Sequence, residues 1–211
     1  MARVSPHAVG LLSVLVAAAA SALLLAERRG PRTVEAGFWF EPVSYASARI
    51  GGALTPADLH TISAVAREEL VAAFEGLGIT LTDERHAPYR VQVVQEVRDP
   101  RTRRDMKVAG HSRGVPGIGG VGVVSFAFFA SGATVYAPDT ATRDAIIAAI
   151  GRGIGRGAVH EFTHQLLPKA AIHASRDPAS YEYRSAARPE QFFGEMRWNL
   201  ARPLLQARLG W

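Results

Sequence analysis

The stretch AVHEFTHQLL, residues 158–167, holds two histidines four positions apart, His160 and His164, with Glu161 directly after the first. The apolar flanks favour a buried helix, on which residues four apart project from one face, so both imidazoles can reach one metal ion. Glu161 lies about 100° around the helix from His160, where it can stand beside the metal without binding it. The spacing predicts a zinc centre in which Glu161 takes a proton from a metal-bound water.

The motif resembles that of the zincin metallopeptidases, and the order of elements predicted for residues 55–167 is loosely similar to theirs. The resemblance implies a zincin-like fold, His160 and His164 as zinc ligands, and Glu161 as the general base. It also implies hydrolysis of a peptide or protein substrate. In that fold a strand near the motif helix binds extended substrate by strand addition. Residues 134–137 lie in the matching place, directly before the helical region.

The residues after the motif depart from the best-known zincin subgroups. Metzincins have Gly and His where this chain has Leu167 and Ala170. Thermolysin-like gluzincins have Asp four residues after their ligand Glu, whereas Glu182 is followed at that offset by Ala186. The surroundings of Asp177 do not reproduce the aspzincin signature. The resemblance therefore leaves the subfamily and the third zinc ligand open.

Several side chains downstream of the motif could supply the third ligand. His173 is favoured, because Pro168 ends the helix within a turn of His164 and lets the chain turn back toward the metal. The segment from Pro168 to His173 can span roughly 15 Å, enough for this return, and imidazole suits zinc. Asp177 would then orient an imidazole. Glu182, between two tyrosines that could stabilise an oxyanion, is the second choice. The full set of candidates is His173, Asp177, Glu182, Glu190 and Glu195.

Upstream of the motif, strand-like and helix-like patterns follow one another. Thr55 and Pro56 are typical of a helix start, and apolar residues recur at helical spacing as far as Leu77. The Gly-rich residues 110–122 are predicted to form a loop; their G-x-G-x-x-G match lacks a following helix, so no nucleotide cofactor is expected. Strands are predicted over residues 38–45, 79–82, 89–97, 123–130 and 133–137, a helical region over 139–167 with a possible break at 151–157, and a final helix over 189–209. This order predicts an α+β fold with a mixed sheet in a single domain, residues 33–211.

Residues 8–26 form an uncharged, apolar run of 19 residues. A signal peptide fits this run, because small residues at 20–22 supply a cleavage site. A membrane anchor also fits, because the run is long enough to span a bilayer. Basic residues flank both ends, so the positive-inside rule does not decide between them. Residues 1–32 are therefore assigned to a signal peptide or signal anchor with a short linker, and the domain is expected to be exported, either free or tethered to the membrane facing outward.

The composition excludes several kinds of site and partner. The chain has no cysteine, which excludes disulfides, thiolate metal sites and cysteine nucleophiles. Of the net charge of +5, residues 1–32 contribute +3, from four arginines and one glutamate. The basic cluster at residues 98–107 is interrupted by two aspartates and lacks aromatics, so no nucleic-acid partner is expected. The alternative function is a non-catalytic exported binding domain whose zinc is structural or absent, and the sequence indicates no oligomeric state.

Overall fold

A five-stranded mixed sheet organises the protein, whose computed structural model describes residues 33–99, 106–115, 118–168 and 172–210. The order of the strands across the sheet is β4-β1-β5-β9-β8. Strands β4, β1, β5 and β9 run parallel, whereas β8 runs antiparallel to β9 and forms one edge. The mixed sheet that the sequence predicts is therefore confirmed. The strands are β1 (Val34–Phe40), β4 (Ile79–Thr82), β5 (Tyr89–Val94), β8 (Gly110–Val115) and β9 (Gly119–Ser125).

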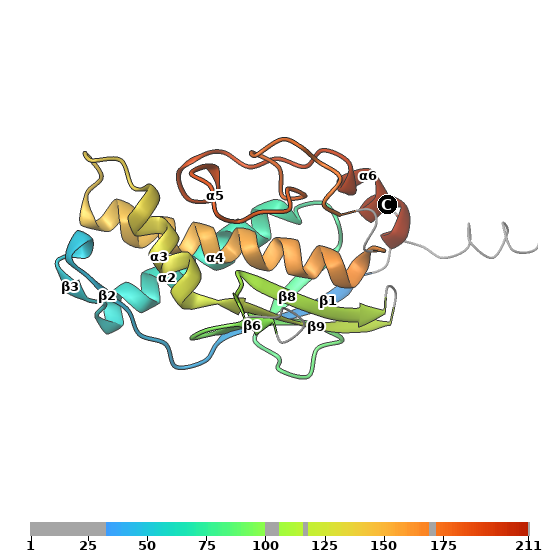
Figure 1. Cartoon of the computed structure of the whole chain (residues 1–211). Helices are drawn as coiled ribbons and strands as arrows, with labels where there is room; N and C mark the ends of the chain where they lie inside the picture. The colour runs from blue at the N-terminus through green and yellow to red at the C-terminus, as the bar shows by residue number, and fades with distance from the viewer. Residues whose placement is uncertain (1–32, 100–105, 116–117, 169–171, 211) are drawn as a thin grey trace, which may run out of the picture. The chain divides into compact units, whose positions relative to one another are not determined.

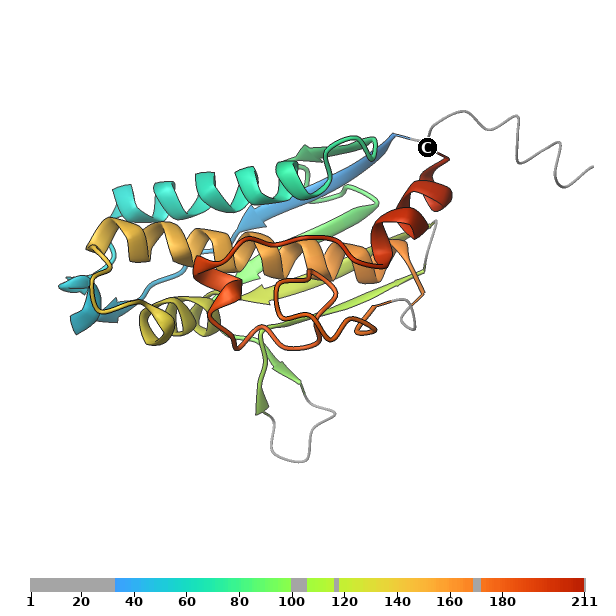
Figure 2. The same cartoon turned by 90° about the horizontal axis from the view of Figure 1, so that it is seen from above.

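Helices cover one face of this sheet, as the two views show (Figures 1 and 2). The two longest, α2 (Pro56–Ala73) and α4 (Arg143–Leu166), lie side by side over the sheet. The core fills the space between these helices and the sheet; its fully buried side chains include Phe38, Val91, Val93, Ile62, Ile150 and Ile154. The remaining elements are η1 (Ala48–Ile50), α3 (Phe126–Tyr136), α5 (Glu190–Phe193), α6 (Ala201–Leu209) and the short strands β2 (Ala46–Ser47), β3 (Gly52–Ala53), β6 (Arg98–Asp99) and β7 (Met106–Lys107).

Helix α4 carries the histidine motif and runs without a break through its glycines. A Cβ atom at Gly151 would lie 2.7 Å from the carbonyl oxygen of Ile62, and one at Gly155 would lie 2.6 Å from that of Ala66. Both carbonyls belong to α2, so the missing side chains let the two helix backbones approach closely. The glycines therefore serve helix packing, and the predicted possible break at residues 151–157 is absent.

The segment before α4 differs most from the prediction. The Gly-rich residues form the β8–β9 hairpin instead of a loop, and the predicted strands at 123–130 and 133–137 are replaced by the end of β9 and by α3. Ser125 starts α3 by accepting a hydrogen bond from the Phe128 amide, 3.3 Å away. An unbroken apolar run shows no alternation of apolar and polar residues, so its sequence could not distinguish a helix from a strand. The buried residues of α3, Phe126, Phe129, Ala130 and Ala133, follow helical spacing.

The predicted C-terminal helix over residues 189–209 is also wrong, because it is two helices, α5 and α6, with an irregular segment between them. Strand β1 begins four residues earlier than predicted, at Val34, and ends at Phe40. The expected export segment, residues 8–26, lies outside the described residues. No helix among the described residues is long and apolar enough to cross a membrane.

Candidate metal centre

Three imidazole rings converge at the C-terminal half of α4. The Nε2 atoms of His160 and His164 lie 3.1 Å apart, and those of His160 and His173 lie 2.9 Å apart. The Nε2 atoms of His164 and His173 lie 3.2 Å apart, so the three nitrogens form a triangle. Tetrahedral zinc, bonded to nitrogen at about 2.0–2.1 Å, separates its ligand atoms by roughly 3.3–3.4 Å. The three nitrogens therefore fit one shared zinc-sized ion with only a small expansion of the triangle.

The chain returns to α4 after the helix ends. Leu167 has an extended backbone, and Pro168 follows it, as expected for a stop at this point. His173 then lies beside the two motif histidines, where the sequence prediction placed it. It has φ of 71°, and no other non-glycine residue in the described part of the chain has a positive φ. Such a conformation is uncommon for a residue with a side chain and persists where the surrounding structure holds it; here the His173 amide donates to the Glu182 carbonyl at 3.1 Å.

The ring of His160 is oriented by a backbone carbonyl. Its Nδ1 lies 2.8 Å from the carbonyl oxygen of Tyr181, which can only accept, so Nδ1 carries the proton and Nε2 keeps its lone pair for a metal. Burial lowers the pKa of His160 to about 4, against the opposing effect of this hydrogen bond. The imidazole is therefore neutral at physiological pH, which is the form that binds a metal. The sequence suggested Asp177 as the group that orients an imidazole; for His160 this contact comes from the Tyr181 carbonyl.

Glu161 lies beside the histidines and is almost fully buried, with 6% of its surface exposed. Its Oε2 is buried and has no hydrogen-bond partner among the described residues. The backbone of Gly110 in β8 comes close, since a Cβ there would lie 2.8 Å from Oε1 of Glu161. Burial raises the pKa of Glu161 to about 8, while Ser112 acts to lower it. A buried carboxylate oxygen without a partner is costly, and a water molecule or a cation beside it would lower that cost.

Glu182, the second choice for third ligand, has a different role. Its side chain is fully buried and accepts hydrogen bonds from the backbone amides of Asn199, Leu200 and Ala201 at 2.8–2.9 Å. These amides precede and open α6, whose first N–H groups have no partner within the helix. A carboxylate also suits the positive end of the helix dipole. Glu182 therefore caps α6, and it is not grouped with the three histidines.

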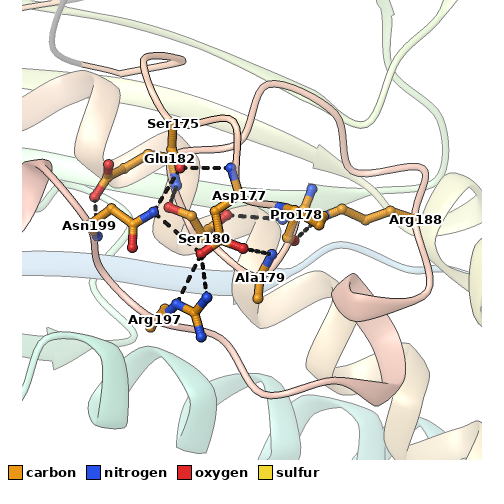
Figure 3. Close-up of polar contacts among 9 residues, drawn as sticks. All are labelled: Ser175, Asp177, Pro178, Ala179, Ser180, Glu182, Arg188, Arg197 and Asn199. Carbon is orange, nitrogen blue, oxygen red and sulfur yellow. Dashed lines mark hydrogen bonds and ion pairs between the residues drawn. The ribbon is translucent and has the colours of Figure 1, made fainter.

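The loop between His173 and α5 is tied together by polar contacts (Figure 3). Asp177 accepts hydrogen bonds from the Ala179 amide at 2.9 Å and from the Arg197 side chain at 2.9 Å. Arg188 donates to the carbonyl oxygens of Pro178 and Ser180, at 2.5 and 3.1 Å. These bonds fix the loop that presents the Tyr181 carbonyl to His160. Neither of the remaining third-ligand candidates, Glu190 and Glu195, is grouped with the histidines.

The histidines open onto a cleft with a volume of about 790 Å³. Strand β8 forms one wall, and residues 181–188 form another. Among the described residues, Glu161 is the only acidic side chain that lines the cleft. The basic side chains of the lining are Lys107, Arg113, Arg156, Arg184 and Arg188.

Sequence reasoning missed the wall formed by β8, because glycines at positions 110 and 114 suggested a loop. It also missed Gln165, whose side-chain amide bonds both the N–H and the carbonyl of Arg90, each at 3.1 Å. This fully buried residue fixes α4 against β5 one residue after His164. The sequence offered one signal for this role, because Gln165 is a polar residue directly before the apolar pair Leu166 and Leu167.

Comparisons of this chain with protein families, with curated proteins and with solved structures find no match.

Proposed function

We propose that this protein is an exported, zinc-dependent peptidase of the zincin type. The observation that carries the proposal is the convergence of three Nε2 atoms, within 3.2 Å of one another, beside a buried glutamate with an unpartnered oxygen. His160, His164 and His173 would hold the zinc. When bound, zinc supplies an acidic water molecule and polarises the carbonyl of the scissile bond.

With zinc in place, Glu161 would act as the general base that accepts a proton from the attacking water and as the acid that returns it to the leaving amine. Its pKa of about 8 belongs to the metal-free protein; a nearby dication lowers the pKa of a carboxyl group, so the carboxylate form is available when zinc is present. The geometry supports a base role for Glu161 because its carboxylate is buried next to the histidines without being one of the three converging ligands.

Strand β8 is the best candidate for binding an extended substrate. It is the antiparallel edge of the sheet, and among the described residues no strand pairs with its outer side. It also lines the cleft, so a peptide added to this edge would pass the three histidines. This assignment replaces the one suggested from the sequence, because residues 134–136 belong to α3.

The charge of the cleft favours acidic peptides. Arg113 on β8 and Arg184 on the opposite wall are both exposed, and neither makes an ion pair with a described residue. Arg156, by contrast, is already paired with Glu69, and Lys107 with Glu96. A substrate with Asp or Glu near the cleaved bond would meet unpaired positive charge on both walls.

The alternative is a binding domain with a structural zinc. A structural site is closed by four protein ligands, whereas a catalytic site keeps a position for water. Among the described residues, three histidines form the group of possible ligands, which supports a catalytic site.

Metal analysis of the full chain, combined with an assay on unstructured proteins, tests the proposal. We expect one zinc per chain, loss of zinc in His160→Ala, and cleavage that a chelator abolishes and added zinc restores. Stoichiometric zinc without cleavage of any substrate would favour the binding domain. A chain that binds no zinc would contradict both the zinc-dependent peptidase and the binding domain with a structural zinc.

A further inference from the structure

Large exposed apolar side chains are concentrated at one end of the described structure. Isolated exposed apolar residues are normal in soluble proteins, whereas several of them gathered in one region indicate an interaction surface. Six of seven lie in segments that meet at the same end of the sheet, and only Val135 lies elsewhere. The seven exposed fractions are 60% for Val71, 56% for Val115, 75% for Ile118, 39% for Val121, 71% for Val135, 53% for Leu200 and 45% for Leu204.

The register of the sheet places the β8–β9 turn at the end where β1 begins. Ala36, near the start of β1, pairs with Tyr89 at the start of β5, and Tyr89 pairs in turn with Gly120 near the start of β9. Val115, the last residue of β8, pairs with Gly119. The chain therefore enters this unit, at residue 33, at the same end as Val115, Ile118 and Val121.

Helices α2 and α6 bring the other three side chains to this end. Val71 is in the last turn of α2, and the amide of Val34 donates to the Gly78 carbonyl at 2.8 Å, just beyond that helix. Trp198 and Arg202 donate to carbonyl oxygens of residues 73 and 75, which places α6 beside the end of α2 (Figure 2). We call the side chains of Val71, Val115, Ile118, Val121, Leu200 and Leu204 the apolar end.

Val135 lies at the opposite end of the sheet. It is in the last turn of α3, whose Thr134 hydroxyl lies 3.0 Å from that of Tyr45. Arg49 donates to the Ala137 carbonyl at 3.1 Å, and both Tyr45 and Arg49 follow the far end of β1. Val135 is therefore an exposed apolar residue that serves as an internal control.

We propose that the apolar end rests on the surface of the lipid bilayer that holds residues 8–26. Six residues, 27–32, join that apolar run to residue 33. Even fully extended they reach only roughly 20 Å, so an anchored chain keeps the apolar end close to the membrane. Three of the six are arginines, which favour anionic lipid headgroups. The inference rests on residues 8–26 being a membrane anchor, and it does not depend on the zinc chemistry.

Single-cysteine labelling tests this contact, because the chain has no cysteine of its own. Ile118→Cys, Leu204→Cys and the control Val135→Cys each carry an environment-sensitive fluorophore. The full chain is reconstituted into vesicles of phosphatidylcholine and phosphatidylglycerol that contain a nitroxide-labelled lipid as quencher. We expect blue-shifted emission and strong quenching at positions 118 and 204, and neither effect at position 135.

Three results would overturn the proposal. Equal quenching at all three positions would mean that this end has no preferred contact with lipid. A blue shift at 118 and 204 that grows with protein concentration, without quenching by lipid, would assign this end to contact between copies of the chain. Failure of the chain to float with the vesicles would remove the anchor. None of these outcomes alters zinc binding or hydrolysis, so the proposed function is tested separately.

Discussion

His160 and Glu161 are neighbours in α4, and burial moves their pKa values in opposite directions. Removal from water lowers the pKa of the imidazole to about 4 and raises that of the carboxyl to about 8. Both shifts favour the neutral form. A neutral imidazole is ready to bind a metal, whereas a carboxyl group needs a nearby cation to act as a base at neutral pH. The pair therefore suits a site that is completed by a metal ion.

Glu161→Gln should separate metal binding from catalysis. The amide has nearly the same shape, so the three histidines are expected to keep the zinc while the base is lost. General base catalysis typically contributes about 10²–10⁴-fold, and kcat should fall by that amount. Zinc stoichiometry and the rate of peptide hydrolysis, measured on the same preparation, check this. Loss of zinc from the variant would instead identify Glu161 as a ligand.

His173→Ala and Glu182→Ala should have different effects, although both residues belong to the segment after α4. His173→Ala removes one of three converging nitrogens, so zinc affinity should fall sharply. Glu182→Ala leaves three buried or partly buried amides without an acceptor and should lower the free energy of unfolding by about 1–3 kcal/mol. Zinc titration and urea unfolding of both variants provide the comparison. Weakened zinc binding in Glu182→Ala at unchanged stability would contradict the capping role.

At the scale of elements, local signals explain what the sequence could predict. The start of α2 was predictable because Thr55 and Asp58 form a reciprocal capping box with Pro56 in the first turn. The motif helix was predictable from the fixed spacing of its two histidines. Helix α3 was not, because its sequence is apolar throughout and only tertiary burial distinguishes its faces. Strand β8 was hidden by glycines, whose lack of a side chain lets this strand approach Glu161.

For the third ligand, too, only what depends on local sequence could be predicted. Chain reach and the position of Pro168 favoured His173 over four carboxylates, and the structure groups His173 with the motif histidines. The role of Glu182 depends on amides 17–19 residues further along the chain, so it could not be found from local sequence. The orienting group of His160 is a backbone carbonyl, which no residue type reveals.

The walls of the cleft should determine a preference for acidic peptides. Arg113→Glu and Arg184→Glu should each weaken the preference for a peptide with Glu near the cleaved bond over its Gln counterpart. One solvent-exposed charge pair is worth at most about 1 kcal/mol, or roughly fivefold in kcat/KM. Arg85→Glu is the control, because this exposed arginine pairs with Glu41 and does not line the cleft. An unchanged Glu-to-Gln ratio in both cleft variants would show that these arginines do not select substrate.

On the scale of the whole molecule, the two ends of the sheet differ in chemistry. The apolar end gathers exposed aliphatic side chains where the chain enters the fold. The opposite end is held by charge, where Arg143 at the start of α4 bonds both carboxylate oxygens of Asp58 at the start of α2, at 2.6 and 2.7 Å. This ion pair joins the two helices whose packing positions the histidines, so it links the stability of the whole fold to pH.

Asp58→Asn should lower the stability of the fold at neutral pH and make that stability less sensitive to a fall in pH. Hydrogen bonds from Arg143 and Thr55 hold the pKa of Asp58 well below its usual range. A carboxyl with a lowered pKa in the folded state stabilises the fold above its unfolded pKa, about 3.9, and this contribution is lost as the pH falls further. Because the bonds involve a charged group, the loss at pH 7 should be about 1.5–3 kcal/mol.

Urea unfolding of the full chain from pH 7 to pH 2.5 measures both effects of this substitution. Wild type should lose stability steeply below about pH 4, and Asp58→Asn should start lower and fall less over the same range. Asp139→Asn is the matched control, because Asp139 is fully exposed in its contact with Arg49 and should contribute little. Parallel pH profiles for wild type and Asp58→Asn would mean that the unfolded state holds Asp58 at the same pKa. The ion pair would then position the two helices without stabilising them.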